Sequence, residues 1–227
     1  MIEQQFIENL QKEGIELTKT MIQQFRTYTS LLQEWNEKIN LTSLNETSEI
    51  YEKHFYDSLL IKRLVYFEGE MCDVGSGAGF PGIPCKIVFP ELALTIVEPI
   101  KKRCKFLEIL CKELQINVNI VNGRAEEITK EYDIVTARAV ANLRILAELC
   151  IPLVKKDGYF IAMKGSQGLI EKREAQKATT FLGCEQINED AIKLPDEATR
   201  INLLYKKVRN TPVGYPRMYA KIKKNPL

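Results

Sequence analysis

The chain has 227 residues, of which 45% are hydrophobic and 27% are charged, as is ordinary for a globular protein. No apolar run approaches the roughly 20 residues of a membrane span, and the acidic, amphipathic N-terminus is unlike a cationic secretory signal, so we expect a cytoplasmic protein. With a single histidine and no C-x-x-C pair, a metal site is not expected, and the six scattered cysteines are expected to be buried reduced thiols.

The charge is distributed unevenly along the chain. The residues from Ala198 to the end include eight basic and no acidic side chains, and because the whole chain carries only +2, the preceding residues together carry −6. Clustered lysine and arginine displace counterions from phosphates, so this pattern favours a polyanionic partner. A solvated terminus explains it equally well, and charge alone leaves both open.

The first 68 residues are predicted to be helical. One helix is predicted because apolar residues recur at spacings of three and four, and Asn40, followed by Thr42 and Ser43, should end it. The apolar residues are Ile22, Phe25, Tyr28, Leu32, Trp35 and Ile39. A second helix is predicted from about Thr47 to Val65. Since no strand pattern precedes Gly69, we expect a helical appendage over residues 1–68.

From Glu70 onward, predicted strands alternate with helices. The strands are expected at 70–75, 93–99, 117–123, 131–139 and 158–165, and the helices at 83–89, 101–115, 142–154 and 167–181. Two more strands, 184–195 and 200–208, are joined by a short turn and should be antiparallel. This order predicts an α/β protein with a seven-stranded, mostly parallel sheet and one antiparallel strand. The core would span residues 69–209 and a basic tail residues 210–227.

The loop after the first strand, DVGSGAGFPG, has glycines at Gly75, Gly77 and Gly79. This G-x-G-x-G differs from the G-x-G-x-x-G of dinucleotide folds, and Phe80 and Pro81 crowd the place where a pyrophosphate would lie. No Lys-Ser/Thr follows, which excludes a P-loop. The loop suits a ligand without phosphate there, although a tight turn with no ligand also explains it.

Two further strand ends supply acidic residues. Glu98 ends the second strand, 23 positions after Gly75, where a carboxylate can accept the hydroxyls of a ribose. After the third strand, Ala125 and Glu126 offer a backbone N–H and an acceptor for an adenine edge. Since ligands of such sheets bind at the carboxyl ends of the strands, the three loops together predict S-adenosylmethionine (SAM) and the Rossmann-like fold of class I methyltransferases.

The segment after the fourth strand, TARAVAN, helps to limit the methyl acceptor. It lacks the N/D/S-P-P-Y/F motif of amino-group methyltransferases, and no cysteine lies between Tyr132 and Leu149 to serve a cytosine-C5 enzyme. An acceptor with a free lone pair, such as guanine N7, remains. Its methylation needs no general base, so no catalytic residue is assigned.

Two residues near this segment have competing interpretations. Arg138 could contact guanine or the methionine carboxylate of SAM, or form a salt bridge with Asp133 or Glu148. His54 lies within KHFYDSLL, on a predicted amphipathic helix, and a packing role or a link to Asp57 is favoured over catalysis.

Several stretches, in order from residue 31 to 217, resemble the GidB/RsmG family of bacterial 16S rRNA guanine-N7 methyltransferases. They are LLQEWNEKINLTS, KHFYDSLL, DVGSGAGFPGIPCKI, KKRCKFLEIL, GRAEE, TARAVA, MKG and a terminal YPR. The resemblance implies SAM contacts at Gly75, Phe80, Glu98, Pro99, Ile100, Ala125, Glu126 and Arg138. It also implies that the substrate is a guanine in the 530 loop of 16S rRNA, in the small ribosomal subunit.

The chain departs from the family in two places. The family commonly has Asp where this chain has Glu98, and its tail commonly runs YPR-x-x-G-x-P, whereas here it reads YPRMYAKIKKNPL.

We expect a monomer that contacts RNA through basic side chains on the helix after the second strand, at the end of the fifth strand and in the tail. The candidates are Lys101, Arg103, Lys164, Arg217, Lys221, Lys223 and Lys224. A nicotinamide oxidoreductase and a non-catalytic RNA-binding assembly factor are the alternatives.

Overall fold

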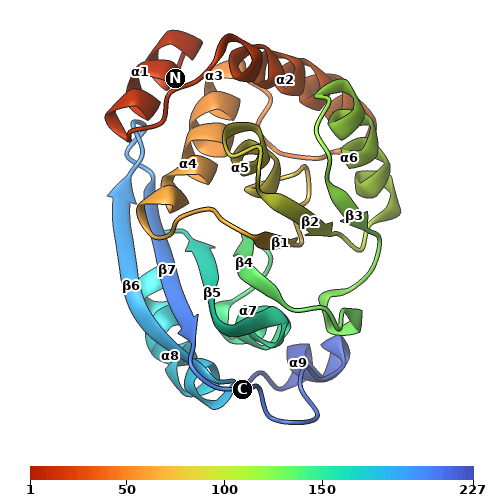
Figure 1. The fold of residues 1–227 in the computed structure, drawn as a ribbon, viewed down its shortest axis with the longest axis vertical. Coiled ribbons are helices and arrows are strands. Elements are labelled where there is room, and N and C mark those ends of the chain that lie inside the picture. Colours follow the sequence, from red (N-terminus) through yellow and green to blue (C-terminus); the bar gives the residue numbers. More distant parts are fainter.

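The structure, a computed structural model, describes all residues 1–227 and is built around one twisted sheet of seven strands (Figure 1). The strands are β1 (Glu70–Val74), β2 (Ala93–Val97), β3 (Asn119–Val121), β4 (Tyr132–Arg138), β5 (Val154–Lys164), β6 (Cys184–Lys193) and β7 (Thr199–Lys207). Their order is β3-β2-β1-β4-β5-β7-β6, and only β7 runs antiparallel to both of its neighbours. The predicted sheet, with one antiparallel strand contributed by the last hairpin, is confirmed.

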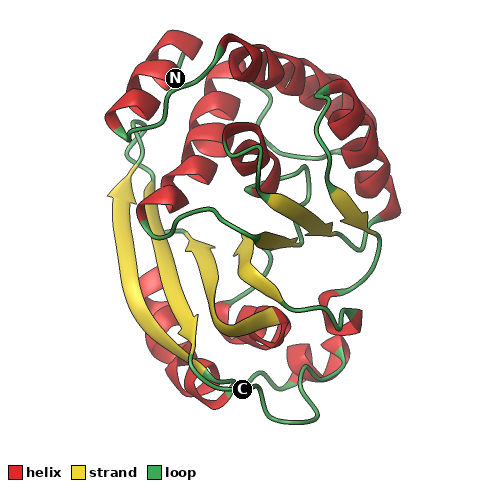
Figure 2. Cartoon of the chain, viewed as in Figure 1, coloured by secondary structure: helices red, strands yellow, loops and turns green.

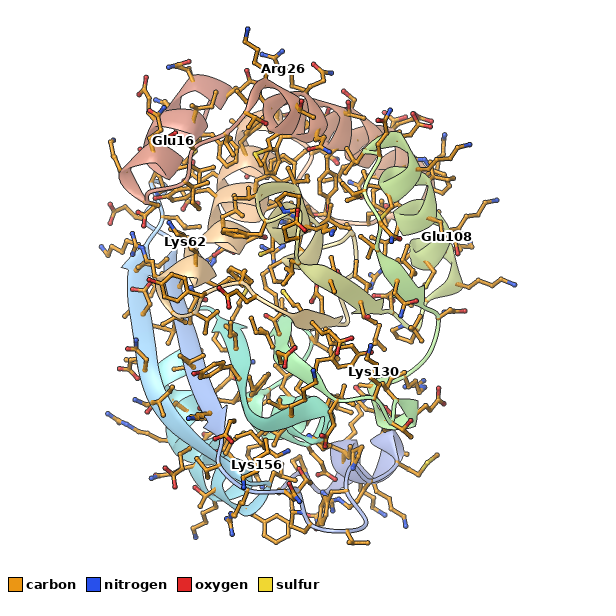
Figure 3. The ribbon with its side chains drawn as sticks, viewed as in Figure 1. Glu16, Arg26, Lys62, Glu108, Lys130 and Lys156 are labelled. Carbon is orange, nitrogen blue, oxygen red and sulfur yellow. The ribbon has the colours of Figure 1, made fainter.

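Helices cover both faces of the sheet (Figure 2). They are α1 (Glu3–Lys12), α2 (Lys19–Ile39), α3 (Thr47–Glu49), α4 (Asp57–Leu59), α5 (Gly82–Val88), α6 (Lys101–Glu113), α7 (Leu143–Cys150), α8 (Gly168–Phe181) and α9 (Tyr219–Lys224). None of them is both long enough and apolar enough to cross a membrane. Charged side chains such as Glu16, Glu108 and Lys156 lie on the outside of this shell (Figure 3).

Each face of the sheet has its own hydrophobic core because successive strand residues point to opposite faces. In β1, Met71 belongs to the core under α1, α2, α5 and α6, while Cys72 belongs to the core under α7 and α8. The N-terminal helices share the first of these cores with the sheet, through residues such as Phe25 and Phe55. All six cysteines are buried and unpaired, as predicted.

The second predicted N-terminal helix is continuous but changes type. Between α3 and α4, residues Ile50–Tyr56 form a π-helix, and Leu60–Arg63 form a 3₁₀ turn after α4. A π-helical turn is uncommon and is frequently found at functional sites. This segment carries His54 and leads directly into Asp57.

The start of β5 differs from the prediction. Residues 155–157 were expected to separate a helix from the fifth strand, but β5 begins at Val154 and runs through them. The pairing with β4 shifts register between Tyr132 and Ile134 at this point. A Cβ at Gly158 would lie 2.7 Å from the carbonyl oxygen of Asp133, so glycine allows the two strands to approach each other here.

Candidate functional site

β1 leads directly into a turn of alternating glycines. Gly75, Gly77 and Gly79 have φ angles of 69°, 62° and 104°, in the region that residues with a side chain rarely adopt. A Cβ at Gly75 would lie 2.7 Å from a methyl carbon of Val140, and one at Gly79 would lie 2.6 Å from the hydroxyl oxygen of Tyr28. The turn therefore brings bare backbone to the carboxyl end of the sheet.

Side chains from two elements hold this turn in shape. The Asp73 carboxylate accepts hydrogen bonds from the Ser76 hydroxyl (2.7 Å) and the Gly82 amide (2.8 Å), and burial raises the pKa of Asp73 to about 6. From α2, the Tyr28 hydroxyl donates to the carbonyl oxygen of Ala78 at 2.6 Å. The turn is therefore preorganised by β1 and by the N-terminal helical segment together.

Glu98, at the end of β2, lies against the glycine turn. Its Oε2 accepts from the Gly77 amide and its Oε1 from the Ile100 amide, both at 2.9 Å, and the residue is only 1% exposed. Pro99 and Ile100, next in the chain, are exposed, and Arg103 lies 3.9 Å from the Glu98 carboxylate. The side chain of Glu98, which is longer than that of the Asp common in the resembled family, thus bonds directly to the backbone amide of Gly77.

The third loop is joined to the C-terminal segment. Ala125 and Glu126 begin a short 3₁₀ turn, and Glu126 Oε1 accepts a hydrogen bond from the Tyr219 amide at 3.2 Å. The guanidinium of Arg124 lies 5.4 Å from the centre of the Tyr219 ring. The residue predicted to bind adenine is therefore also a contact of α9.

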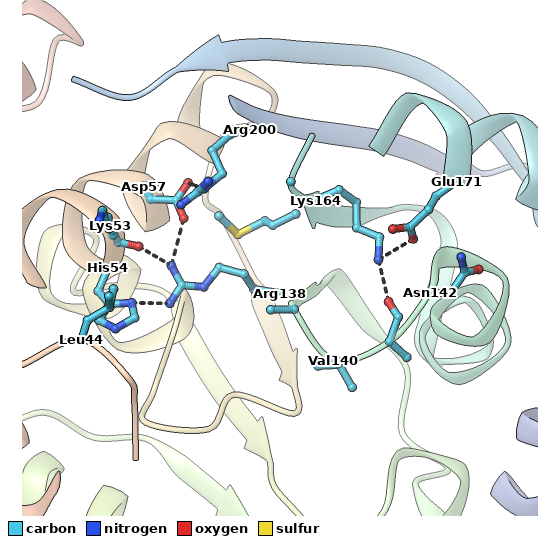
Figure 4. Close-up of a pocket in the computed structure, with 14 residues that line it drawn as sticks. Leu44, Lys53, His54, Asp57, Arg138, Val140, Asn142, Lys164, Glu171 and Arg200 are labelled. Atoms are coloured by element: carbon cyan, nitrogen blue, oxygen red, sulfur yellow. Dashed lines mark hydrogen bonds and ion pairs between the residues drawn. The ribbon is translucent and has the colours of Figure 1, made fainter. Parts of the chain in front are cut away.

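Arg138, at the end of β4, is held by the N-terminal helical segment. It donates to the Lys53 carbonyl oxygen (3.1 Å), to Asp57 Oδ2 (3.1 Å) and to His54 Nδ1 (3.0 Å), as Figure 4 shows. Its guanidinium also lies 4.9 Å from the centre of the Phe80 ring, which is itself buried. The Arg138 side chain is thus fixed by three acceptors and one aromatic face.

The two acids considered as salt-bridge partners of Arg138 pair with other cations instead. Asp133 pairs with Lys155 at 3.0 Å, and Glu148 pairs with Arg217 at 2.6 Å. The pairing of Arg138 with Asp57 crosses 81 residues of sequence.

His54 belongs to the same buried cluster. Its ring stacks on Phe80 with 4.3 Å between ring centres, and its Nε2 lies 2.9 Å from the Thr42 hydroxyl. Burial, and then the positive charge of Arg138, lower the pKa of His54 to about 3. The ring is therefore neutral near pH 7, and we assign Nδ1 as the acceptor from Arg138 and Nε2–H as the donor to Thr42. The favoured link between His54 and Asp57 exists, through Arg138.

A cavity of about 570 Å³ opens beside this cluster, at the carboxyl ends of β4 and β5 (Figure 4). It is lined by Leu44, Lys53, His54, Asp57, Arg138, Ala139, Val140, Ala141, Asn142, Met163, Lys164, Gly165, Glu171 and Arg200. None of the glycines of the turn lines it, but Val140 both lines the cavity and packs against Gly75. The glycine turn and the cavity are thus neighbours, with Val140 at their boundary.

Known proteins match this chain over most or all of its length. The family model described as "rRNA small subunit methyltransferase G" (GidB) matches residues 21–199. A ribosomal RNA small subunit methyltransferase G of Lysinibacillus sphaericus is 48% identical over 100% of both chains. A Bacillus subtilis protein of the same name is 45% identical over 99% of this chain and 98% of the relative. The chain belongs to the rRNA small subunit methyltransferase G family.

Solved structures of lower sequence identity share the fold of this family member. A methyltransferase from Pyrococcus furiosus superposes with a TM-score of 0.57 and 12% identity, covering 80% of this chain and 96% of that one. The TYW2 protein of M. jannaschii, solved in complex with AdoMet, gives a TM-score of 0.53 and 11% identity, covering 66% of this chain and 74% of that one. The predicted class I methyltransferase fold is confirmed.

The basic residues predicted to contact RNA fall into two groups in this family member. Lys101 on α6 and Lys221, Lys223 and Lys224 on α9 are exposed, and Arg103 is partly exposed. Lys164 and Arg217 are instead engaged within the protein: Lys164 with Glu171 at 2.8 Å, and Arg217 with Glu148. Contact of any of these residues with RNA stays a prediction.

Sequence reasoning linked Asp57 to His54 but did not connect it with Arg138, and it did not single out Asp73 as part of the site. A signal for Asp57 was present, because His54 and Asp57 are three residues apart and such residues lie on one face of a helix. For Asp73 the signal was its place at the end of β1, directly before the glycines.

Proposed function

We propose that this chain transfers a methyl group from SAM to N7 of a guanine in the 530 loop of bacterial 16S rRNA, in the cytoplasm. The observation that carries the proposal is the contact of Glu98 with the Gly77 amide, next to the cavity at the ends of β4 and β5. Bare backbone, a carboxylate and a polar cavity side by side suit a nucleoside donor next to a base acceptor. Family membership supports the same reaction.

The residues present fit SAM as the methyl donor. The turn has no lysine that would bind a phosphate, its glycines leave room beside the backbone, and Glu98 and Glu126 are acceptors at two neighbouring strand ends. Glu98 would hold the ribose hydroxyls, and Ala125 and Glu126 the adenine edge. When bound, SAM supplies an electrophilic methyl group on a sulfonium centre.

The cavity lining fits a guanine acceptor. Arg138 and Arg200 are donors for the guanine O6, while Asp57 is an acceptor for its N–H groups. The N7 lone pair is free at neutral pH, so the protein needs to orient the base rather than remove a proton. Methylation leaves a positive charge on the ring, which the Asp57 carboxylate would stabilise.

A methyl-transfer assay with 16S rRNA and with small ribosomal subunits tests the proposal. The full chain, supplied with isotope-labelled SAM, should produce one 7-methylguanine in the 530 loop, mapped by mass spectrometry of nuclease fragments. Glu98→Ala should abolish the transfer because the ribose acceptor and the link to Gly77 are both lost. Absence of labelled 7-methylguanine with either substrate would overturn the proposal.

The same preparation distinguishes the alternatives. Equilibrium binding of NAD(H) without binding of SAM would favour an oxidoreductase. If Glu98→Ala restored ribosome assembly in a deletion strain as well as the natural chain does, the protein would act as an assembly factor.

A further inference from the structure

The loop between β4 and α7, residues Ala139–Asn142, lies between the glycine turn and the cavity. All four of its residues line the cavity, and Val140 also packs against Gly75. Ala139 has φ +54°, a left-handed conformation that is unfavourable for a residue with a Cβ. Contacts outside the loop must therefore hold it in place.

Two side chains from other elements supply those contacts. Lys164, the last residue of β5, donates through Nζ to the Ala141 carbonyl oxygen at 2.6 Å and to Glu171 Oε2 at 2.8 Å. Glu171, on the first turn of α8, accepts through the same oxygen from the Leu143 amide at 2.7 Å. Figure 4 shows the ammonium group of Lys164 between the Glu171 carboxylate and the loop.

The ends of the loop are thus attached to a pair of charges that is largely shielded from water. The side chains of Lys164 and Glu171 are 5% and 20% exposed. The amides of a first helical turn have no partner within the helix, so Glu171 satisfies the first free amide of α7, at Leu143. Asn142 caps the next one, because its side chain accepts from the Arg144 amide.

We propose that Lys164 and Glu171 are positioning residues, which hold the Ala139–Asn142 loop so that Val140 closes the glycine turn on one side and shapes the acceptor cavity on the other. This inference rests on the proposed function for its catalytic consequence. Lys164 then serves the site through the loop and not as a phosphate contact, since its ammonium group already has two partners.

Steady-state kinetics of Lys164→Met and Glu171→Ala separate these two roles. Loss of positioning should lower kcat by about ten- to a hundredfold, because misplacement of a site by about 1 Å has effects of that size. The KM for rRNA and its salt dependence should stay within about twofold. The kcat of the double variant should be no lower than that of the less active single variant, because both side chains act through one loop. Lys164→Arg, which keeps the cation, should recover most of kcat.

A second measurement does not depend on catalysis. Hydrogen exchange of the Leu143 amide should become at least about tenfold faster in Lys164→Met and Glu171→Ala, since this amide loses its partner or the partner loses its anchor. Glu174→Ala, an exposed position on the same helix, is the matched control and should leave exchange and kcat unchanged.

The outcomes are distinguishable from failure of the proposed function. If the natural chain transfers no methyl group, the proposed function fails, and faster exchange at Leu143 would still support the positioning of the loop. If the natural chain is active but the variants keep its kcat and exchange rate, the positioning role is wrong. A raised KM for rRNA with a shallower salt dependence and an unchanged kcat would make Lys164 a phosphate contact and would also overturn it.

Discussion

The N-terminal helical segment and the C-terminal segment are both fastened to the sheet domain by an arginine–carboxylate pair. At the N-terminal attachment the arginine, Arg138, comes from the sheet and the acid, Asp57, from the added helices. At the C-terminal attachment the roles are reversed, since Arg217 of the tail binds Glu148 on α7 through both of its oxygens, each at 2.6 Å. Asp57 and Glu148 are both buried.

The two attachments differ in what surrounds them. Asp57 and Arg138 line the cavity, together with Arg200, whose Nε lies 3.2 Å from Asp57 Oδ1. Glu148 and Arg217 line no part of that cavity. The N-terminal segment is therefore part of the site, whereas the tail is held in place by a pair that lies outside the cavity.

The largest effect is expected from removing the charge at the N-terminal attachment. Asp57→Asn leaves Arg138 and Arg200 close together without a counterion, and breaking a buried pair in this way costs about 3–5 kcal/mol of unfolding free energy. Turnover should also fall by about a hundredfold, because Arg138 loses its orientation. Urea unfolding and the methyl-transfer rate measure the two effects.

The control for Asp57→Asn is Asp133→Asn. Asp133 also pairs with a cation, Lys155, but both side chains are about 40% exposed, so less than about 1 kcal/mol is expected. Equal losses in the two variants would mean that the Asp57 cluster has no special role.

The next largest effect is expected at the C-terminal attachment. Arg217→Ala leaves the carboxylate of Glu148 buried without a cation, and we expect a loss of about 3 kcal/mol in unfolding free energy. The double variant Arg217→Met/Glu148→Leu should recover most of that loss, because no buried charge remains. Turnover at saturating rRNA should change much less than in Asp57→Asn. An equal fall in turnover would show that the C-terminal attachment affects the site as much as the N-terminal one does.

The difference between the attachments also explains what could be predicted from sequence. The glycine turn, the position of Glu98 at the end of the second strand and the alternation of strands and helices along the chain follow from short contiguous patterns, and these were predicted. The partners of Arg138 lie 81 to 85 residues away. The only acidic partners considered for it, Asp133 and Glu148, lie closer in sequence. The π-helix before Asp57 also rotates the helix face by an amount that periodicity does not reveal.

The tail shows a second limit of sequence reasoning. Its composition predicts a basic segment, and four of its residues, from 210 to 227, are lysine or arginine. Yet Ile222 is fully buried in the core under α7, and Arg217 is an internal anchor. A helix of six residues is too short for periodicity to show which side chain it buries.

A smaller, pH-dependent effect should distinguish the two attachments, since only the N-terminal one contains a histidine. The pKa of His54 is lowered from 6.5 to about 3, so between these values the unfolded chain binds a proton that the folded chain does not. Stability should therefore fall as the pH drops below 6.5, with a limiting slope of about 1.4 kcal/mol per pH unit from this residue.

The His54→Gln variant isolates this contribution. The raised pKa of Asp73 has the opposite effect on stability at acidic pH, but it is present in both proteins and cancels in their difference. The unfolding free energy of the natural chain minus that of the variant, measured from pH 4.5 to 7, should rise with pH and level off above 6.5. A flat difference would show that His54 titrates alike in the folded and unfolded chains.

The smallest effect on stability is expected from the exposed lysines of α9. Neutral glutamines at Lys221, Lys223 and Lys224 should change the unfolding free energy by less than about 0.5 kcal/mol each. If these lysines contact phosphates, each substitution should lower the salt dependence of rRNA binding, the slope of log K against log[salt], by about 0.7 to 0.9. Deleting residues 211–227 is a poorer test, because it also removes Arg217 from Glu148 and Ile222 from the core. An unchanged salt slope in the triple variant would leave the tail with a structural role alone, and its Arg217 anchor would then be its main contribution to the protein.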